Sequence, residues 1–114
     1  MASKRVTDHF GVLEYLKQLN KKDQKLFIKG ASPELLKTIS EICLNLLKGT
    51  IKISKEDIDK LRRFKKQILH LSEKRHSVKV RRDMCSQKGG FLGSLIAVAL
   101  PSIISAIVSA TTKR

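Results

Sequence analysis

The chain has 114 residues, which suffice for one small domain and leave too little length for a second core. Its 24 Lys and Arg against 10 Asp and Glu give a formal net charge of +14, which excludes an acidic surface and favours a polyanionic partner, either nucleic acid or an anionic membrane. Cys43 and Cys85 are the only cysteines, so a disulfide framework is excluded and a reducing compartment is favoured. The first ten residues lack the apolar run of a secretory signal, so we expect the chain to begin in the cytosol or the nucleus.

Apolar residues at helical spacing predict several short helices in the first half of the chain. The first is predicted at residues 7–20, and a short helical stretch is predicted around residues 26–28, ending at Gly30. The clearest helix is predicted at residues 33–48, because Ser32 and Pro33 are a strong start signal and Gly49 ends the pattern. Cys43 falls on its apolar stripe, so we expect a buried thiol.

A second strong helix is predicted after residues 50–53, which have the pattern of an extended connector. Ser54 and Asp57 resemble a capping box at its start. Its apolar stripe comprises Ile58, Leu61, Phe64, Ile68 and Leu71. We expect this stripe to bury against the stripe of the preceding helix, while basic side chains occupy the opposite arc.

The basic charge is concentrated after this point. Residues 60–88 hold 11 basic and 2 acidic side chains, net +9, and the helical pattern disappears over residues 77–88. We therefore predict a flexible basic linker that ends at Gly89 and Gly90. The basic residues predicted to contact nucleic acid are Lys60, Arg62, Arg63, Lys65, Lys66, Lys74, Arg75, Lys79, Arg81, Arg82 and Lys88. The alternative is an ordinary solvated charged face.

Residues 91–110 contain no charge and are long enough to cross a bilayer as a helix. Three interpretations of this segment stay open: a membrane helix, a helix lying at a membrane surface, and a core helix packed on the N-terminal bundle. Small residues form one strip of the predicted helix, and large aliphatic residues form the opposite side.

No catalytic or metal-binding pattern is present in the sequence. His9, His70 and His76 lie on separate elements, without a paired nucleophile or the spacing of metal ligands. We expect a non-enzymatic protein without a metal or cofactor. Phe64 is the one aromatic residue of the basic segment and lies on the apolar stripe, so we expect binding that is independent of base sequence.

The run RRDMCSQKGGFLGSLIAVALPSIISAIVSA, residues 81–110, resembles the C-terminal part of the adenovirus late mu core protein (protein X) precursors. The QKGGFLG string is similar to related short proteins of Maverick or Polinton elements and adintoviruses. The resemblance implies a virion core protein that helps condense double-stranded DNA, in the virion core or the host nucleus. It also implies cleavage by a viral cysteine protease after Gly90, at a processing site formed by Gly89, Gly90 and Phe91. The adenoviral protease prefers Met, Ile or Leu where this chain has Gln87.

Together these features predict an all-α protein in three parts: a small helical domain at residues 1–75, a basic linker at residues 76–90, and a hydrophobic C-terminal helix at residues 91–114. Two alternatives share this layout. One is a tail-anchored protein of an intracellular membrane, inserted through residues 91–110, and the other is a precursor that releases a lytic peptide at Gly90. The Gly-Gly pair is alternatively only a helix stop and a hinge.

Overall fold

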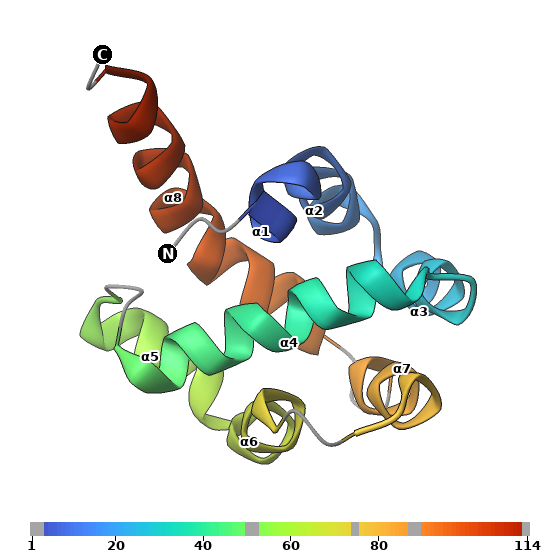
Figure 1. The fold of residues 1–114 in the computed structure, drawn as a ribbon. Helices are drawn as coiled ribbons and strands as arrows, with labels where there is room; N and C mark the ends of the chain where they lie inside the picture. The colour runs from blue at the N-terminus through green and yellow to red at the C-terminus, as the bar shows by residue number, and fades with distance from the viewer. Residues whose placement is uncertain (1–3, 50–52, 74–75, 87–89, 113–114) are drawn as a thin grey trace.

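The computed structural model describes residues 4–49, 53–73, 76–86 and 90–112, apart from the side chains at 106–107 and 109–112, and this part of the chain contains eight helices and no strand (Figure 1). The helices are α1 (Lys4–Asp8), α2 (Phe10–Gln18), α3 (Lys21–Lys29), α4 (Pro33–Lys48), α5 (Lys55–Arg62), α6 (Lys65–Ser72), α7 (Val78–Ser86) and α8 (Phe91–Thr112). The all-α prediction is confirmed. The predicted connector at residues 50–53 lies outside the described residues except for Ile53.

Local side-chain capping explains where several helices begin. The Ser32 hydroxyl accepts a hydrogen bond from the Leu35 amide at 3.2 Å, and Ser54 accepts one from Asp57 at the same distance. Asn20 caps α3 in the same way, through the Asp23 amide at 2.8 Å. Gly49, at φ +76°, ends α4 in the left-handed conformation that glycine adopts without strain. The predicted bounds of α4 are therefore confirmed.

Two helices predicted as continuous are each broken once, so those predictions are wrong. The first divides into α1 and α2 at His9, and the second divides into α5 and α6 at Arg63 and Phe64. Phe64 has φ −106° and ψ 14°, outside the helical range. This break accompanies a tertiary contact, because the buried Phe64 ring meets the Phe91 ring edge-on at 5.6 Å between centroids.

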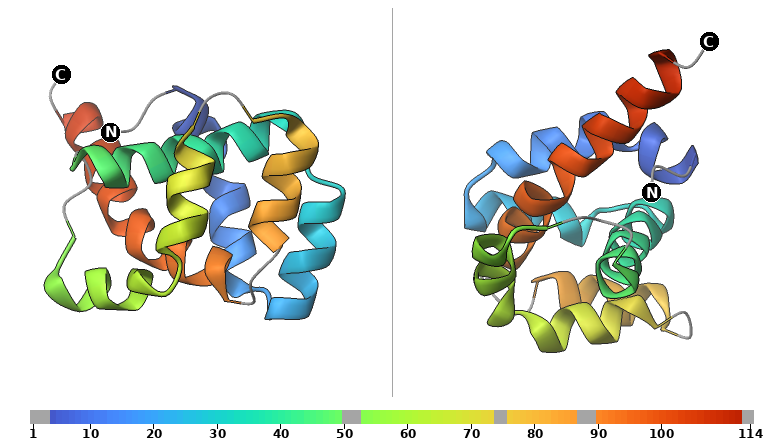
Figure 2. Two further views of the ribbon diagram at one scale, coloured as in Figure 1. Left: turned by 90° about the horizontal axis from the view of Figure 1, so that it is seen from below. Right: turned by 90° about the vertical axis from the view of Figure 1, so that its left-hand side faces the viewer.

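The helices form a ring closed on its two sides by α4 and α8. In Figure 1, α2, α3, α7 and α6 are seen nearly end-on around the molecule, while α4 crosses in front of them and α8 runs behind. The left view in Figure 2 shows α6, α7 and α3 standing side by side. Helix α4 packs on α6, and Ile39, Ile42, Ile68 and Leu71 are all buried, which confirms the predicted contact for the α6 part of the second stripe. Ile58, at the α5 end of that stripe, is 45% exposed, so its predicted burial is wrong.

The hydrophobic C-terminal helix forms, but its first half lies in the core of the bundle. Phe91, Leu95, Ile96 and Ile103 are at most 1% exposed, and α8 packs on α2, α5 and α7. A helix that is apolar on nearly all sides is stabilised by burial, which explains why the first half of α8 packs against its neighbours. Among the described residues, no single helix reaches the length and hydropathy of a membrane span, and only the pair Val78–Ser86 and Phe91–Ser105, bent by 97°, does so together.

The predicted flexible linker is wrong for residues 78–86, which form α7. Ser77 caps this helix through the Val80 amide at 3.2 Å, and α7 packs on α3, α4 and α6. The side of α7 that faces the other helices carries four residues at helical spacing, Val78, Arg81, Arg82 and Cys85. Since two of these four positions are arginines, the face does not have the pattern of an apolar stripe in the sequence.

Candidate nucleic-acid interface

The predicted basic residues of α5 are exposed, but acidic neighbours on the same helix compensate their charge. Lys60 lies 4.0 Å from Asp57, and Arg62 lies 3.1 Å from Asp59. Helix α5 contains three basic and three acidic residues, so it is formally neutral. Exposed pairs of this kind contribute little to stability, yet they reduce the positive potential that a phosphate meets.

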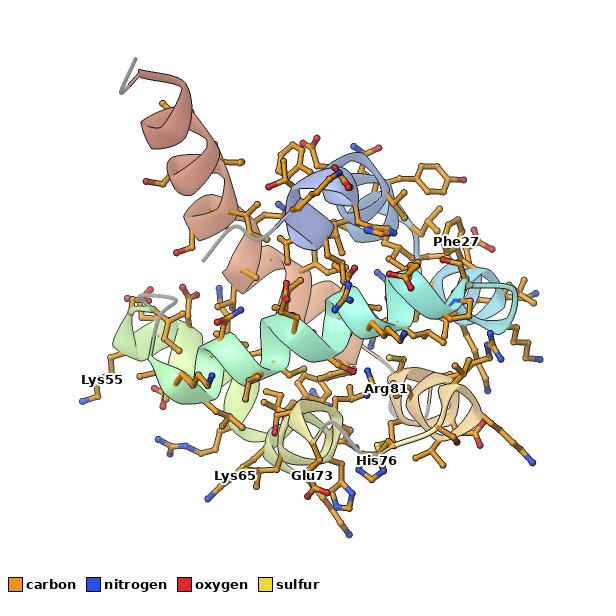
Figure 3. The ribbon with its side chains drawn as sticks, viewed as in Figure 1. Phe27, Lys55, Lys65, Glu73, His76 and Arg81 are labelled. Carbon is orange, nitrogen blue, oxygen red and sulfur yellow. The ribbon has the colours of Figure 1, made fainter. Side chains whose placement is uncertain are left out.

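A stronger positive surface lies where α5 meets α6. We call Arg63, Lys65 and Lys66 the α6 surface; all three are exposed, and no acidic residue lies within residues 63–72. The Arg63 guanidinium sits 5.0 Å from the centre of the Phe64 ring, which holds the side chain against the protein. Lys65 points away from α7 into solvent (Figure 3). Phosphate groups can reach these three cations from the solvent side.

Arg81 and Arg82 have hydrogen-bond partners within the protein, so they are less available to phosphate than the other predicted residues. The Arg82 guanidinium donates to the carbonyl oxygens of Ile28 at 3.2 Å and Ala31 at 2.7 Å, where α3 ends. Arg81 is 9% exposed, and its Nε donates to the His76 carbonyl at 3.2 Å. Carbonyls at a helix end lack partners within the helix, and a guanidinium satisfies both their hydrogen bonds and the negative end of the helix dipole. Both arginines therefore serve the fold.

The remaining predicted residues on or near α7 contribute less. Lys79 is exposed, but it shares its strip of the helix with the exposed Asp83 four residues later. Lys74, Arg75 and Lys88 lie outside the described residues. The outward strip of α7 is thus close to neutral.

A basic surface on α3 was not predicted. Lys21, Lys22, Lys25 and Lys29, which we call the α3 surface, are all exposed, and Asp23 is the one acidic residue of this helix. Their density, four lysines in nine residues, is visible in the sequence. It was obscured because the charge of α3 was averaged with the acidic residues of its neighbours.

The predicted processing site is partly built into the fold. Gly89 lies outside the described residues, while Gly90 adopts φ +87° immediately before α8. The Lys21 side chain and the Phe64 ring lie close to Gly90, since a Cβ there would come within 3.4 Å of Lys21 Cε and 3.9 Å of Phe64 Cζ. Phe91 is fully buried. A protease cleft requires an extended strand, so access to this bond requires α8 to leave the core locally.

The histidines and cysteines have structural surroundings. His9 Nδ1 lies 2.8 Å from the Arg5 carbonyl, and the His70 and His76 rings stack 6.0 Å apart. Burial raises the pKa of Cys85 to about 12. The pKa of Cys43 is raised well above its usual value, first by burial and second by the nearby Cys85. The expected buried Cys43 is confirmed. Within the described ranges no three His, Cys, Asp or Glu side chains gather as a metal site.

Among known proteins, no family model, no curated protein and no solved structure matches this chain.

Proposed function

We propose that this chain is a non-enzymatic protein that binds double-stranded DNA without sequence preference through the α6 surface and the α3 surface. The observation that carries the proposal is the presence of seven exposed basic side chains on two helical segments that together hold only one acidic residue, Asp23. Each contact with a phosphate releases condensed counterions, which is favourable at low salt. The formal net charge of +14 attracts the duplex over a longer range.

The chemistry of these surfaces supports binding to the phosphate backbone rather than to bases. Six of the seven side chains are lysines, which act as point charges without the planar fork that reads guanine. Phe64 and Phe91 are buried, so neither offers a platform for base stacking. Tyr15 is exposed, but it lies on α2 and its ring contacts Phe27 at 5.7 Å.

As a biological setting we propose a virion core protein that acts on packaged DNA, in line with the resemblance of residues 81–110. Cleavage by a viral cysteine protease after Gly90 is part of this proposal. Because Phe91 is buried, we expect cleavage to require an opened form of the chain. Intact mass of protein from mature particles tests this, since a product that ends at Gly90 or begins at Phe91 supports processing and exclusively uncut protein contradicts it.

The decisive experiment measures the affinity for a short duplex as a function of salt. We expect a logarithmic slope of about −0.9 for each phosphate contact. Replacing Arg63, Lys65 and Lys66 by Gln should reduce the slope by about 3 units. The control variant has Gln in place of Lys17, Lys37 and Lys48, which are exposed lysines on other helices, and it should change the salt slope less. A preference above about a hundredfold for one of two unrelated duplexes would contradict sequence independence.

A second candidate function is association with a membrane, and the end of α8 favours it. This end projects from the rest of the molecule in Figure 1, and Ile104 and Val108 on it are 43% and 53% exposed. Apolar side chains on a projecting helix insert into a lipid surface at low cost. Retention of the expressed chain in membranes after a high-salt and carbonate wash would favour this candidate, and release would favour the nucleic-acid protein.

A further inference from the structure

We infer that the α3 surface and the α6 surface bind separate duplexes, so that one molecule bridges two DNA segments. This inference rests on the proposed function and adds to it a second binding surface with its own role. The observations behind it are the arc that the α3 lysines form, the neutral strip that separates them from α6, and the different directions in which the two surfaces face.

The four lysines of α3 form a single coherent face. Their positions in the sequence are i, i+1, i+4 and i+8, which at 100° per residue places them within an arc of about 100°. The buried residues Gln24 and Ile28 lie beside this arc, and Asp23 lies outside it. The rise from Lys21 to Lys29 is about 12 Å, which matches a run of several phosphates on one DNA strand.

Helix α7 separates this face from the α6 surface. It packs on α3 along one side and on α6 along the other. Its outward charges, Lys79 and Asp83, lie four residues apart and compensate each other. Packed helices are about 8–10 Å apart, so the axes of α3 and α6, which flank α7 at a corner, lie less than about 16–20 Å apart. The two surfaces approach each other at one end, where Lys21 and Arg63 both lie near the Phe64 ring, and diverge from there on either side of α7.

The two surfaces also face in different directions. In Figure 1, α3 stands at one side of the ring and α6 at its lower edge, with α7 between them at the corner. Figure 3 shows Lys65 pointing away from α7 and hence away from α3. A straight duplex that lies along one of these faces leaves the other facing solvent, where it can bind a second duplex.

Tertiary contacts fix the orientation of α3, which is a short helix. Arg82 binds the carbonyls at its C-terminal end, and the buried Gln24 donates to the Leu16 carbonyl at 2.9 Å. Gln24 also packs against Gly93 of α8, where a Cβ would lie only 3.3 Å from Gln24 Nε2. The α3 surface is thus preorganised at a fixed position relative to α6, which reduces the entropy lost on bridging.

The test uses the full chain with two short duplexes of unrelated sequence, one carrying a donor dye and the other an acceptor dye. We expect energy transfer at low salt at substoichiometric protein, and its loss as salt rises. Replacing all four α3 lysines by Gln should abolish transfer while binding to a single duplex persists. Replacing Lys65 and Lys66 by Gln should abolish transfer in the same way, with binding retained through α3.

The matched control replaces Lys17, Lys37, Lys48 and Lys55 by Gln, which lowers the net charge by the same amount at exposed positions of other helices. This variant should keep bridging. Persistent transfer in the α3 variant, or transfer that depends on the square of the protein concentration, overturns the inference, because the second case means that two molecules are required. Binding to one duplex without any transfer refutes bridging alone, whereas no binding to either duplex refutes the proposed function.

Discussion

The guanidinium of Arg82 donates a hydrogen bond of 2.7 Å to the carbonyl oxygen of Ala31, 51 residues earlier in the chain. A second bond, from its Nε to the Ile28 carbonyl at 3.2 Å, joins the same two segments. This side chain links α7 to the end of α3. Arg82 belongs to the most basic segment of the sequence, yet its charge stabilises the fold. The charges of this segment therefore divide into those that hold helices together and those that face solvent.

Arg82→Ala should lower the free energy of unfolding by about 2–3 kcal/mol, because two hydrogen bonds from a charged group are lost, although the Ile28 carbonyl keeps the Ala31 amide as a partner at 3.1 Å. Lys79→Ala, on the outward strip of the same helix, removes one positive charge and should change stability by less than about 0.5 kcal/mol. Urea unfolding followed by circular dichroism measures both. Equal stability of the two variants would mean that Arg82 does not tie α7 to α3.

Ile42→Asp should unfold the bundle. Ile42 lies on α4 and is fully buried. A carboxylate at this position has no cationic partner on the apolar stripe, and burying such a charge costs several kcal/mol of folding free energy. Helicity and melting temperature report the change. Lys48→Gln, at an exposed position of the same helix, serves as the control and should melt close to the parent protein. An unchanged melting curve for Ile42→Asp would refute the packing of α4 on α6.

Gly90→Ala should destabilise the chain by about 1–2 kcal/mol, because a Cβ at φ +87° is strained in the left-handed region. Gly11→Ala is the matched control: Gly11 lies in α2, and a methyl group added there would meet nothing within 4 Å, so alanine should stabilise the helix by about 0.5–1 kcal/mol. Thermal melts of the two variants should therefore shift in opposite directions. A neutral Gly90→Ala would indicate that this turn does not need glycine.

The two thiols should react slowly with alkylating reagents in the native protein. Burial raises both pKa values, that of Cys85 to about 12, so the reactive thiolate is scarce at neutral pH. Denaturant should accelerate the reaction to the rate of free cysteine. Fast labelling without denaturant would mean that α4 and α7 open readily.

The same pKa shift makes stability depend on pH in a defined direction. Cys85 keeps its proton in the folded chain while an unfolded thiol loses it above about pH 8.5, so the contribution of Cys85 is complete below that pH and falls as pH rises toward 12. Urea unfolding at about pH 8 and about pH 10, on either side of the ordinary thiol pKa, measures the difference. Cys85→Ala should lose stability less steeply over this interval, and an equal slope in both proteins would contradict the assignment.

Much of the fold was predictable from local patterns. The start of α4 at Pro33 and its end at Gly49 follow from capping chemistry that involves only neighbouring residues. The burial of Ile42 and Phe64 follows from their spacing. The breaks at His9 and Phe64 were not predictable, because the apolar period continues across both, and α7 was missed because arginines occupy two of its four inner positions.

For the candidate site, the sequence by itself determined the excess of positive charge, the absence of a catalytic pattern and an uncharged C-terminal segment. Only the tertiary structure decided which charges face solvent, because a guanidinium such as that of Arg82 serves equally well as a phosphate ligand or as a partner for helix-end carbonyls. It also decided that the first half of α8 lies in the core. An uncharged apolar helix gains similar free energy from lipid or from protein side chains, and the partners that bury Phe91 and Leu95 come from helices distant in the sequence.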